Sequence, residues 1–223
     1  MDIQPIAFFD SPFKTKFGVP RQSGLVTELR GRIVFEPEYR SPDAIRGLEG
    51  FDYLWLIWGF SNIDSDKTVF KATVRPPRLG GNERIGVFAS RSPFRPNRLG
   101  LSSVRIVSLD PEGSVIEVSG ADLMDGTPIY DIKPYVTYAD SHPDARSGFV
   151  DDEEWKPLDV TLAPGVEGSG VDLTVLKEVL ALDPRPSYHD DPSKVYGMSF
   201  GGYDVRFTVD GNTLTIIEVN VSN

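Results

Sequence analysis

Cysteine is absent from this sequence and histidine is scarce. The 223 residues include no cysteine and two histidines, His142 and His189. Without cysteine the chain has no disulfide, no thiolate metal site, no iron–sulfur cluster and no cysteine nucleophile. Two histidines in separate polar segments do not predict a metal centre or a Ser-His-Asp triad. The sequence therefore predicts no metal site, and it fits a reducing compartment.

Long apolar segments are missing as well. The longest one, residues 51–60, is too short to span a bilayer. The first ten residues, MDIQPIAFFD, lack the basic stretch and long apolar stretch of a secretory signal. These absences predict a cytoplasmic protein with no membrane partner.

The usual nucleotide-binding motifs are also missing. The sequence has no GxxxxGK[ST] and no GxGxxG between a strand and a helix. GVEGSG at residues 165–170 follows no clear strand pattern and is more typical of a linker. A Rossmann-type methyltransferase or dehydrogenase is therefore disfavoured.

Positive charge is concentrated in one stretch of an acidic chain. The chain carries a net charge of −10, but residues 71–105 hold eight Lys or Arg and a single acid, Glu83. This stretch is therefore +7 and the rest of the chain −17. Arginine suits phosphate and carboxylate, and the Pro and Gly between the arginines favour stiff turns. The pattern predicts a preformed cationic binding surface. The alternative is a set of charged turns joining strands.

Short strand patterns dominate the remaining sequence. Strands are predicted at residues 3–9, 30–35, 51–60, 84–89, 101–109, 114–119, 203–209 and 213–219. Helices are predicted after Ser41, a plausible N-cap, and over residues 171–182, with Leu173, Leu176 and Leu180 on one side. Both faces of residues 51–60 are apolar, which predicts cover by a barrel interior on one side and by a helix or partner subunit on the other.

These elements predict a mainly β protein with two parts. Closely spaced strands and turns favour a small N-terminal β-barrel, followed by a smaller α+β domain. The acidic residues 140–170 are predicted to be loop, with the boundary between residues 1–145 and 146–223.

Polar segments next to the predicted strands are the candidates for binding. They are residues 20–22, Ser61-Asn62, the basic stretch and residues 122–135. Loops on a rigid barrel commonly carry binding chemistry. Carboxylates at Asp122, Asp125 and Asp131 suit ribose hydroxyls or a cation, although Asp125-Gly126 is also an ordinary turn sequence. The residues alone predict a cleft with an arginine wall and an acidic corner, and they do not name its ligand.

Five ordered motifs resemble a known family. PRQSG, TVRPPRLGGN, GVFASRSPFRPN, DLMDGTPIYDIKPY and DPRPSY are similar to segments of the TrmO family of tRNA methyltransferases, also called YaeB- or TsaA-like. The resemblance covers nearly the whole chain and implies a single N-terminal β-barrel. It also implies a homodimer that uses S-adenosylmethionine to methylate N6 of threonylcarbamoyladenosine beside the tRNA anticodon.

The resemblance also implies the residues of the site. Carried over by position, the cofactor would contact Pro20, Arg21, Gln22, Ser61, Asn62, Arg91, Leu101, Asp122, Leu123, Met124 and Asp125. Ser61-Asn62 departs from members that have His-Gln there. Candidates for the threonyl carboxylate and tRNA phosphates are Arg78, Arg95, Arg98 and Lys133.

Two roles within this site stay open on the sequence. Asp131 and Tyr135 are the candidates for handling the N6 proton. Phe94 either stacks on an unpaired base or packs on the barrel. The rival function is a non-catalytic module of the same fold that holds the cofactor or RNA. The acidic C-terminal domain either buttresses the dimer, which its charge favours, or docks tRNA.

Overall fold

A computed structural model describes residues 2–61, 70–76, 83–151, 156–186 and 191–222. Its strands are β1 (Ala7–Asp10), β2 (Arg30–Phe35), β3 (Tyr53–Gly59), β4 (Thr73–Val74), β5 (Ile85–Gly86), β6 (Leu99–Leu109), β7 (Val115–Ser119), β8 (Thr127–Pro134), β9 (Asp159–Leu162), β10 (Tyr196–Phe200), β11 (Tyr203–Asp210) and β12 (Thr213–Val221). The α-helices are α1 (Pro42–Ile45), α2 (Thr137–Asp140) and α3 (Leu173–Ala181). Short 3-10 helices cover Pro37–Tyr39, Leu48–Gly50, Val87–Ala89, Gly148–Val150 and Val166–Gly168.

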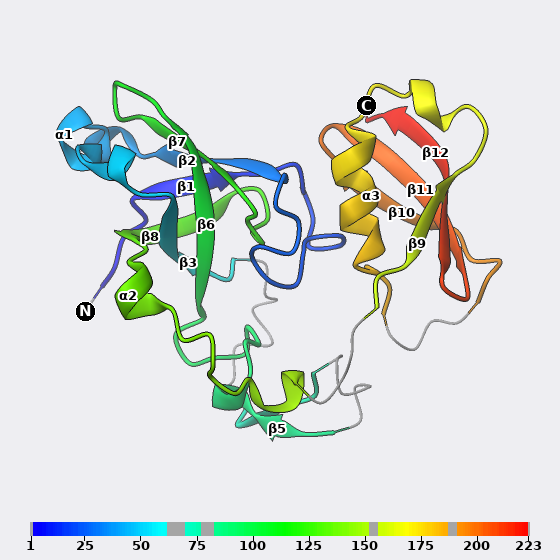
Figure 1. Ribbon diagram of the computed structural model, residues 1–223, viewed down its shortest axis with the longest axis horizontal. Helices are drawn as coiled ribbons and strands as arrows, with labels where there is room; N and C mark the ends of the chain where they lie inside the picture. Colours follow the sequence, from blue (N-terminus) through cyan, green and yellow to red (C-terminus); the bar gives the residue numbers. More distant parts are fainter. Residues whose placement is uncertain (1, 62–69, 77–82, 152–155, 187–190, 223) are drawn as a thin grey trace.

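The N-terminal strands close into a barrel in the order β1-β2-β7-β6-β3-β8 (Figure 1). Alternation along each strand sends apolar side chains inward, as with Leu54, Leu56 and Trp58 of β3. The mainly β fold with a barrel followed by an α+β unit is thereby confirmed. None of the helices in the described part of the chain is long and apolar enough to cross a membrane.

Glycine lets side chains fill two tight places inside the barrel. A Cβ on Gly100 of β6 would lie 2.3 Å from the Trp58 ring, and one on Gly31 of β2 would lie 2.3 Å from Phe9. The large aromatic side chains can therefore lie flat against neighbouring backbone.

The C-terminal unit is a sheet of order β10-β11-β12-β9, with β9 parallel to β12. The sheet and α3 share one apolar core, which includes Leu176, Leu180, Phe207 and Ile216. The predicted hairpin at Asp210-Gly211 is present, and the helix predicted over residues 171–182 is α3. The Asp172 carboxylate caps α3 by accepting from Thr174 N and Val175 N. All barrel strands precede residue 135 and this sheet begins at residue 159; the domain boundary near residue 145 stays a prediction.

Several details of the sequence prediction were wrong. The strand predicted at residues 84–89 is shorter, because β5 ends at Gly86 and a 3-10 helix follows it. The strand predicted at residues 3–9 begins only at Ala7. Strands β4, β8, β9 and β10 were missed. β8 contains Pro128 and Pro134, and it bulges opposite Ile57 and Trp58, so its pattern resembled turns.

The outer face of β3 has less cover than predicted. Tyr53 is 43% exposed, and Trp55 and Ile57 are half-buried. Asp140 of α2 accepts from Trp55 Nε1 at 3.0 Å, so among the described residues α2 covers part of this face. Cover of the rest by a partner subunit stays a prediction.

Candidate functional site

Strand pairing brings several loops to one end of the barrel. Phe9 pairs with Thr127, Gly59 with Leu99 and Arg30 with Ser119. The β1–β2 loop, the long β3–β6 connection and the β7–β8 loop therefore leave the barrel near one another. This end of the barrel, which we call the barrel mouth, carries most of the residues that the sequence nominated.

A chain of hydrogen bonds leads from the barrel interior to a half-buried carboxylate. Trp58 Nε1 donates to Ser102 Oγ at 2.9 Å, and Ser102 Oγ donates to Asp122 Oδ1 at 2.5 Å. Burial raises the pKa of Asp122, while the Ser102 hydrogen bond and the nearby Arg91 charge oppose that rise. The result is a carboxyl group whose charge is only partly compensated by its surroundings.

Two further segments meet this carboxylate. Arg91 Nη1 donates to Gln22 Oε1, and the Ser23 backbone hydrogen-bonds to Asp122. The loop is fixed to the barrel by Gly24 N, which donates to Gly120 O at 2.8 Å. Gln22, Arg91 and Asp122 are thus brought together from three separate parts of the sequence.

Other predicted cofactor residues are placed differently. Pro20 and Leu123 are buried, and the Met124 carbonyl accepts from Thr127 N at 3.2 Å and from Thr127 Oγ1 at 2.7 Å. Leu101 is 57% exposed on the outer wall. Ser61 is exposed, and Asn62 lies outside the described residues.

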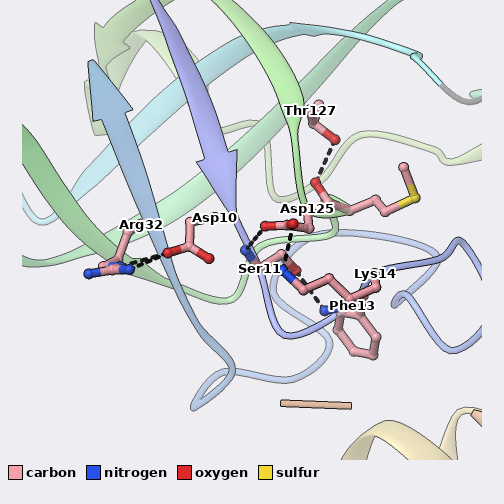
Figure 2. A network of polar contacts seen from close by, with 8 residues as sticks. Asp10, Ser11, Phe13, Lys14, Arg32, Asp125 and Thr127 are labelled. Atoms are coloured by element: carbon pink, nitrogen blue, oxygen red, sulfur yellow. Dashed lines mark hydrogen bonds and ion pairs between the residues drawn. The ribbon is translucent and has the colours of Figure 1, made fainter. Parts of the chain in front are cut away.

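Asp125 is held by a separate polar network, shown in Figure 2. Its carboxylate accepts from Ser11 N at 3.1 Å and from Lys14 Nζ at 2.7 Å, beside the Asp10–Arg32 ion pair. Burial would raise the pKa of Asp125, but the bonds from Lys14 and Ser11 outweigh that effect and lower it. A surface hollow of about 400 Å³ adjoins this network and is lined by Asp10, Lys14 and Arg32 among others. Gln22, Arg91 and Asp122 do not line the hollow.

The two proton-handling candidates lie four residues apart, Asp131 within β8 and Tyr135 just after its end. Asp131 pairs with Ile57, whereas Tyr135 N donates to Tyr53 O at 2.9 Å. At about 3.3 Å per residue along a strand, the two are about 13 Å apart. Asp131 forms an ion pair with Lys133 at 3.0 Å, and the Tyr135 ring packs 5.6 Å from that of Trp55. Asp131 and Tyr135 therefore stay separate candidates for handling the N6 proton.

Among the described residues of the basic stretch, some cations bond to the loop itself. Arg95 Nη1 donates to Val87 O at 3.1 Å and to Ser90 O at 2.6 Å. Arg98 has φ +51°, and its carbonyl accepts from Phe60 N at 2.9 Å. Lys133 is on the barrel wall with Asp131, and Arg78 lies outside the described residues.

An exposed aromatic group in this stretch was not predicted from the sequence. Phe88 is 71% exposed, its ring stacks 6.2 Å from that of Phe70, and the Arg95 guanidinium lies 5.7 Å from its centre. Lys71 lies 4.9 Å from the centre of the Phe94 ring. Aromatics interleaved with cations are typical of surfaces that bind unpaired nucleotides. The signal was available in GVFASRSPFRPN, where Phe88 and Phe94 alternate with Arg91 and Arg95.

The fold and site together define a barrel protein with a polar site at the barrel mouth and a basic, aromatic-bearing loop beside it. Models of the tRNA-methyltransferase O N-terminal domain and the TrmO C-terminal domain match residues 8–141 and 167–222. The chain belongs to the tRNA-methyltransferase O family.

Relatives and solved structures agree over nearly the whole chain. The tRNA (adenine(37)-N6)-methyltransferase of Escherichia coli is 38% identical over 218 residues, with 92% of each chain covered. A Pseudomonas aeruginosa protein named putative S-adenosylmethionine-dependent methyltransferase RcsF is 39% identical and covers 92% of this chain and 91% of its own. A crystal structure of TrmO superimposes with a TM-score of 0.80 at 30% identity, covering 99% of both chains.

Proposed function

We propose that this chain methylates N6 of a tRNA adenosine beside the anticodon, and that the adenosine already carries a threonylcarbamoyl group. The coarser part of this function follows from the family: the chain is an S-adenosylmethionine-dependent tRNA (adenine-N6)-methyltransferase, as its full-length relatives indicate. The observation that carries the proposal is the meeting of Gln22, Arg91 and Asp122 at the mouth of the barrel.

These residues fit the charges of S-adenosylmethionine. Arg91 and Gln22 offer a cation and an amide to the methionine carboxylate, because a guanidinium forms charge-assisted bonds with carboxylates. Asp122 offers an incompletely compensated carboxyl group to an ammonium or to ribose hydroxyls. When bound there, the sulfonium compound supplies an electrophilic methyl group.

The remaining contribution of the protein is to position the substrate and help a proton leave. Alignment of reacting groups lowers the barrier without a strong base. A carbamoyl group on N6 also withdraws electrons and weakens the N–H bond being broken. Of the two candidates for the proton, we favour Asp131, because Ile57 pairs with Leu101 on one side and with Asp131 on the other, in one row across the outer wall.

The row of Leu101, Ile57 and Asp131 lies on the outer wall of the barrel. We infer that a second copy of the chain packs over this row and completes the site. Leu101 is 57% exposed, and aromatic surface is exposed at Tyr53 on β3 and at Phe51 just before this strand. We therefore propose a homodimer that covers the outer face of β3. We also expect the enzyme to act in the cytoplasm, where its proposed tRNA substrate would be found.

Transfer of a tritiated methyl group tests the function directly. The protein is expected to label tRNA that carries threonylcarbamoyladenosine and to label matched tRNA lacking it far less. Equal labelling of both would contradict the proposed substrate. Cofactor binding without labelling of either would favour the non-catalytic module instead.

Arg91→Met gives a matched test of the cofactor site. Removing the cation is expected to raise the Kd for S-adenosylmethionine about tenfold or more, as charge-assisted contacts are worth roughly 1.5–3 kcal/mol. Arg84→Met, an exposed cation of the same basic stretch, is the control and should leave that Kd unchanged. Calorimetry measures both variants, and equal effects would contradict the role of Arg91.

A further inference from the structure

The β1–β2 loop belongs by its packing to the C-terminal domain. Phe13, Val26 and Leu29 are buried in the core of the C-terminal sheet, not in the barrel core. The Phe13 ring meets that of Phe200 edge-on at 5.4 Å, and the Phe17 ring lies nearly parallel to that of Phe207 at 6.4 Å. Figure 1 shows this loop lying between the barrel and α3. A loop with no helix or strand of its own thus obtains its apolar cover from residues far away in sequence.

The contact is close and includes directional bonds. A Cβ on Gly18, where φ is +91°, would lie 2.0 Å from Met198 Sδ, so only glycine fits under that side chain. Gly201 N donates to Pro12 O at 2.9 Å. Arg21 Nη2 donates to Asp183 O at 3.1 Å, and the Asp183 carboxylate is held by Arg185 Nε at 2.9 Å.

The next residues of the same loop form the cofactor side of the barrel mouth. Gln22 accepts from Arg91, and the Ser23 backbone contacts Asp122. Gln22 and Ser23 thus lie between the anchored Arg21 and the buried Val26 and Leu29 of the same loop. A loop loses conformational freedom when it is ordered, and that cost falls on binding unless other contacts order it beforehand.

We propose that the C-terminal domain positions the cofactor loop: its core grips Phe13, Phe17 and Gly18, and the Asp183 carbonyl anchors the Arg21 side chain, so that Gln22 and Ser23 are set in place before the cofactor binds. Arg21 is then a positioning residue whose guanidinium faces the C-terminal domain. The idea rests on the proposed cofactor site, but its structural half can be measured without any cofactor.

Phe17→Leu in the full chain is the first test, with Leu162→Ala as the matched control. Both substitutions remove a similar amount of half-buried apolar side chain from the same core, but Leu162 is on β9, the strand at the opposite edge of the sheet from β10. Hydrogen exchange of residues 12–24 is measured in the cofactor-free protein. The Kd for S-adenosylmethionine is measured by calorimetry, and thermal unfolding reports stability.

Phe17→Leu is expected to speed exchange across residues 12–24 and to raise the Kd about tenfold, because the apparent Kd rises as the ordered fraction of the loop falls. Leu162→Ala is expected to lower Tm by a similar amount while leaving loop exchange and Kd within about twofold of wild type. Equal loop exchange in the two variants would overturn the proposal. If wild type binds no cofactor, the proposed function fails, and the exchange data still decide whether the loop is held.

Arg21→Met and Arg21→Lys separate an anchor from a direct cofactor contact. As an anchor, Arg21→Met speeds loop exchange in the cofactor-free protein and raises the Kd, and Arg21→Lys, which keeps a donor, restores part of both. Normal loop exchange in Arg21→Met, with a raised Kd, would assign Arg21 to the cofactor and contradict its positioning role.

Discussion

At the scale of single residues, Asp122 is the most informative side chain. It is a carboxyl group with a raised pKa, one serine partner and an arginine near enough to affect its charge. Groups of this kind cluster at functional sites, because burial is tolerated where a ligand later supplies the missing partner.

Asp122→Asn is expected to change the pH dependence of stability. Between the ordinary pKa of an aspartic acid and the raised pKa of Asp122, the folded protein holds a proton that the unfolded chain has released. The free energy of unfolding therefore falls as pH rises through this window, and it falls less in the variant, which has no proton to lose there. Urea unfolding at a series of pH values measures the free energy of unfolding of both proteins. Relative to wild type, this free energy should rise for the variant as pH increases through the window. A difference that does not change with pH would contradict the assignment.

Phe88→Ala is expected to weaken tRNA binding without disturbing the fold. Phe88 is 71% exposed beside Phe70 and Arg95. Stacking of one base on an aromatic ring is worth about 1–3 kcal/mol, which corresponds to roughly fivefold to a hundredfold in Kd. Gel shifts measure this change, while Tm and the Kd for S-adenosylmethionine should stay as in wild type.

The control for this surface is Tyr138→Ala, which removes a 92% exposed aromatic from α2. It should leave tRNA binding unchanged. If both variants bound tRNA as wild type does, Phe88 would have no role in RNA recognition.

At the scale of elements, β6 links the barrel core to the site. Trp58 can lie over Gly100 only because that glycine has no side chain, and from there its indole reaches Ser102 and then Asp122. A substitution in the strand should therefore affect both stability and the mouth of the barrel.

Gly100→Ala is expected to destabilise the protein by about 1–3 kcal/mol, the usual cost of overpacking a core. The added Cβ would lie 2.3 Å from the Trp58 ring and displace it. Gly86→Ala is the matched control, because a Cβ there meets open space. Urea midpoints and tryptophan fluorescence compare the two, and equal midpoints would show that Trp58 is not fixed by this contact.

At the scale of the whole molecule, the two halves of the chain share a core. The β1–β2 loop carries Phe13, Val26 and Leu29 out of the barrel and into the C-terminal sheet. The outer face of β3 stays partly exposed: Tyr53 is 43% exposed, and Phe51, just before the strand, is 38% exposed. Exposed aromatic surface of this kind commonly marks a contact between proteins.

Tyr53→Asp is expected to convert the proposed dimer to a monomer, because the interface would bury an unpaired charge. Sedimentation equilibrium measures the mass. Tyr39→Asp, at a tyrosine that is 38% exposed in a short 3-10 helix, should leave the mass unchanged. A monomeric wild-type protein, or a dimer that tolerates Tyr53→Asp, would contradict this interface.

The sequence by itself determined the mainly β class, the β6–β7 and β11–β12 hairpins, the α1 and α3 helices and the family. These features depend on local alternation, turn residues and ordered motifs, which are properties of neighbouring residues. The sequence also nominated the segments that hold Gln22, Arg91 and Asp122 as binding candidates, and the family resemblance singled out these residues as cofactor contacts.

Only the tertiary structure decided which nominated residues meet. It joined Gln22 to Arg91 and turned the Arg21 side chain toward Asp183. It also paired Asp131 with Ile57 within β8 and placed Tyr135 just after the end of that strand. It also moved Phe13 out of the barrel core and into the core of the other domain. Barrel closure and interdomain packing bring together residues that are distant in sequence, and no local pattern records which of them will become neighbours.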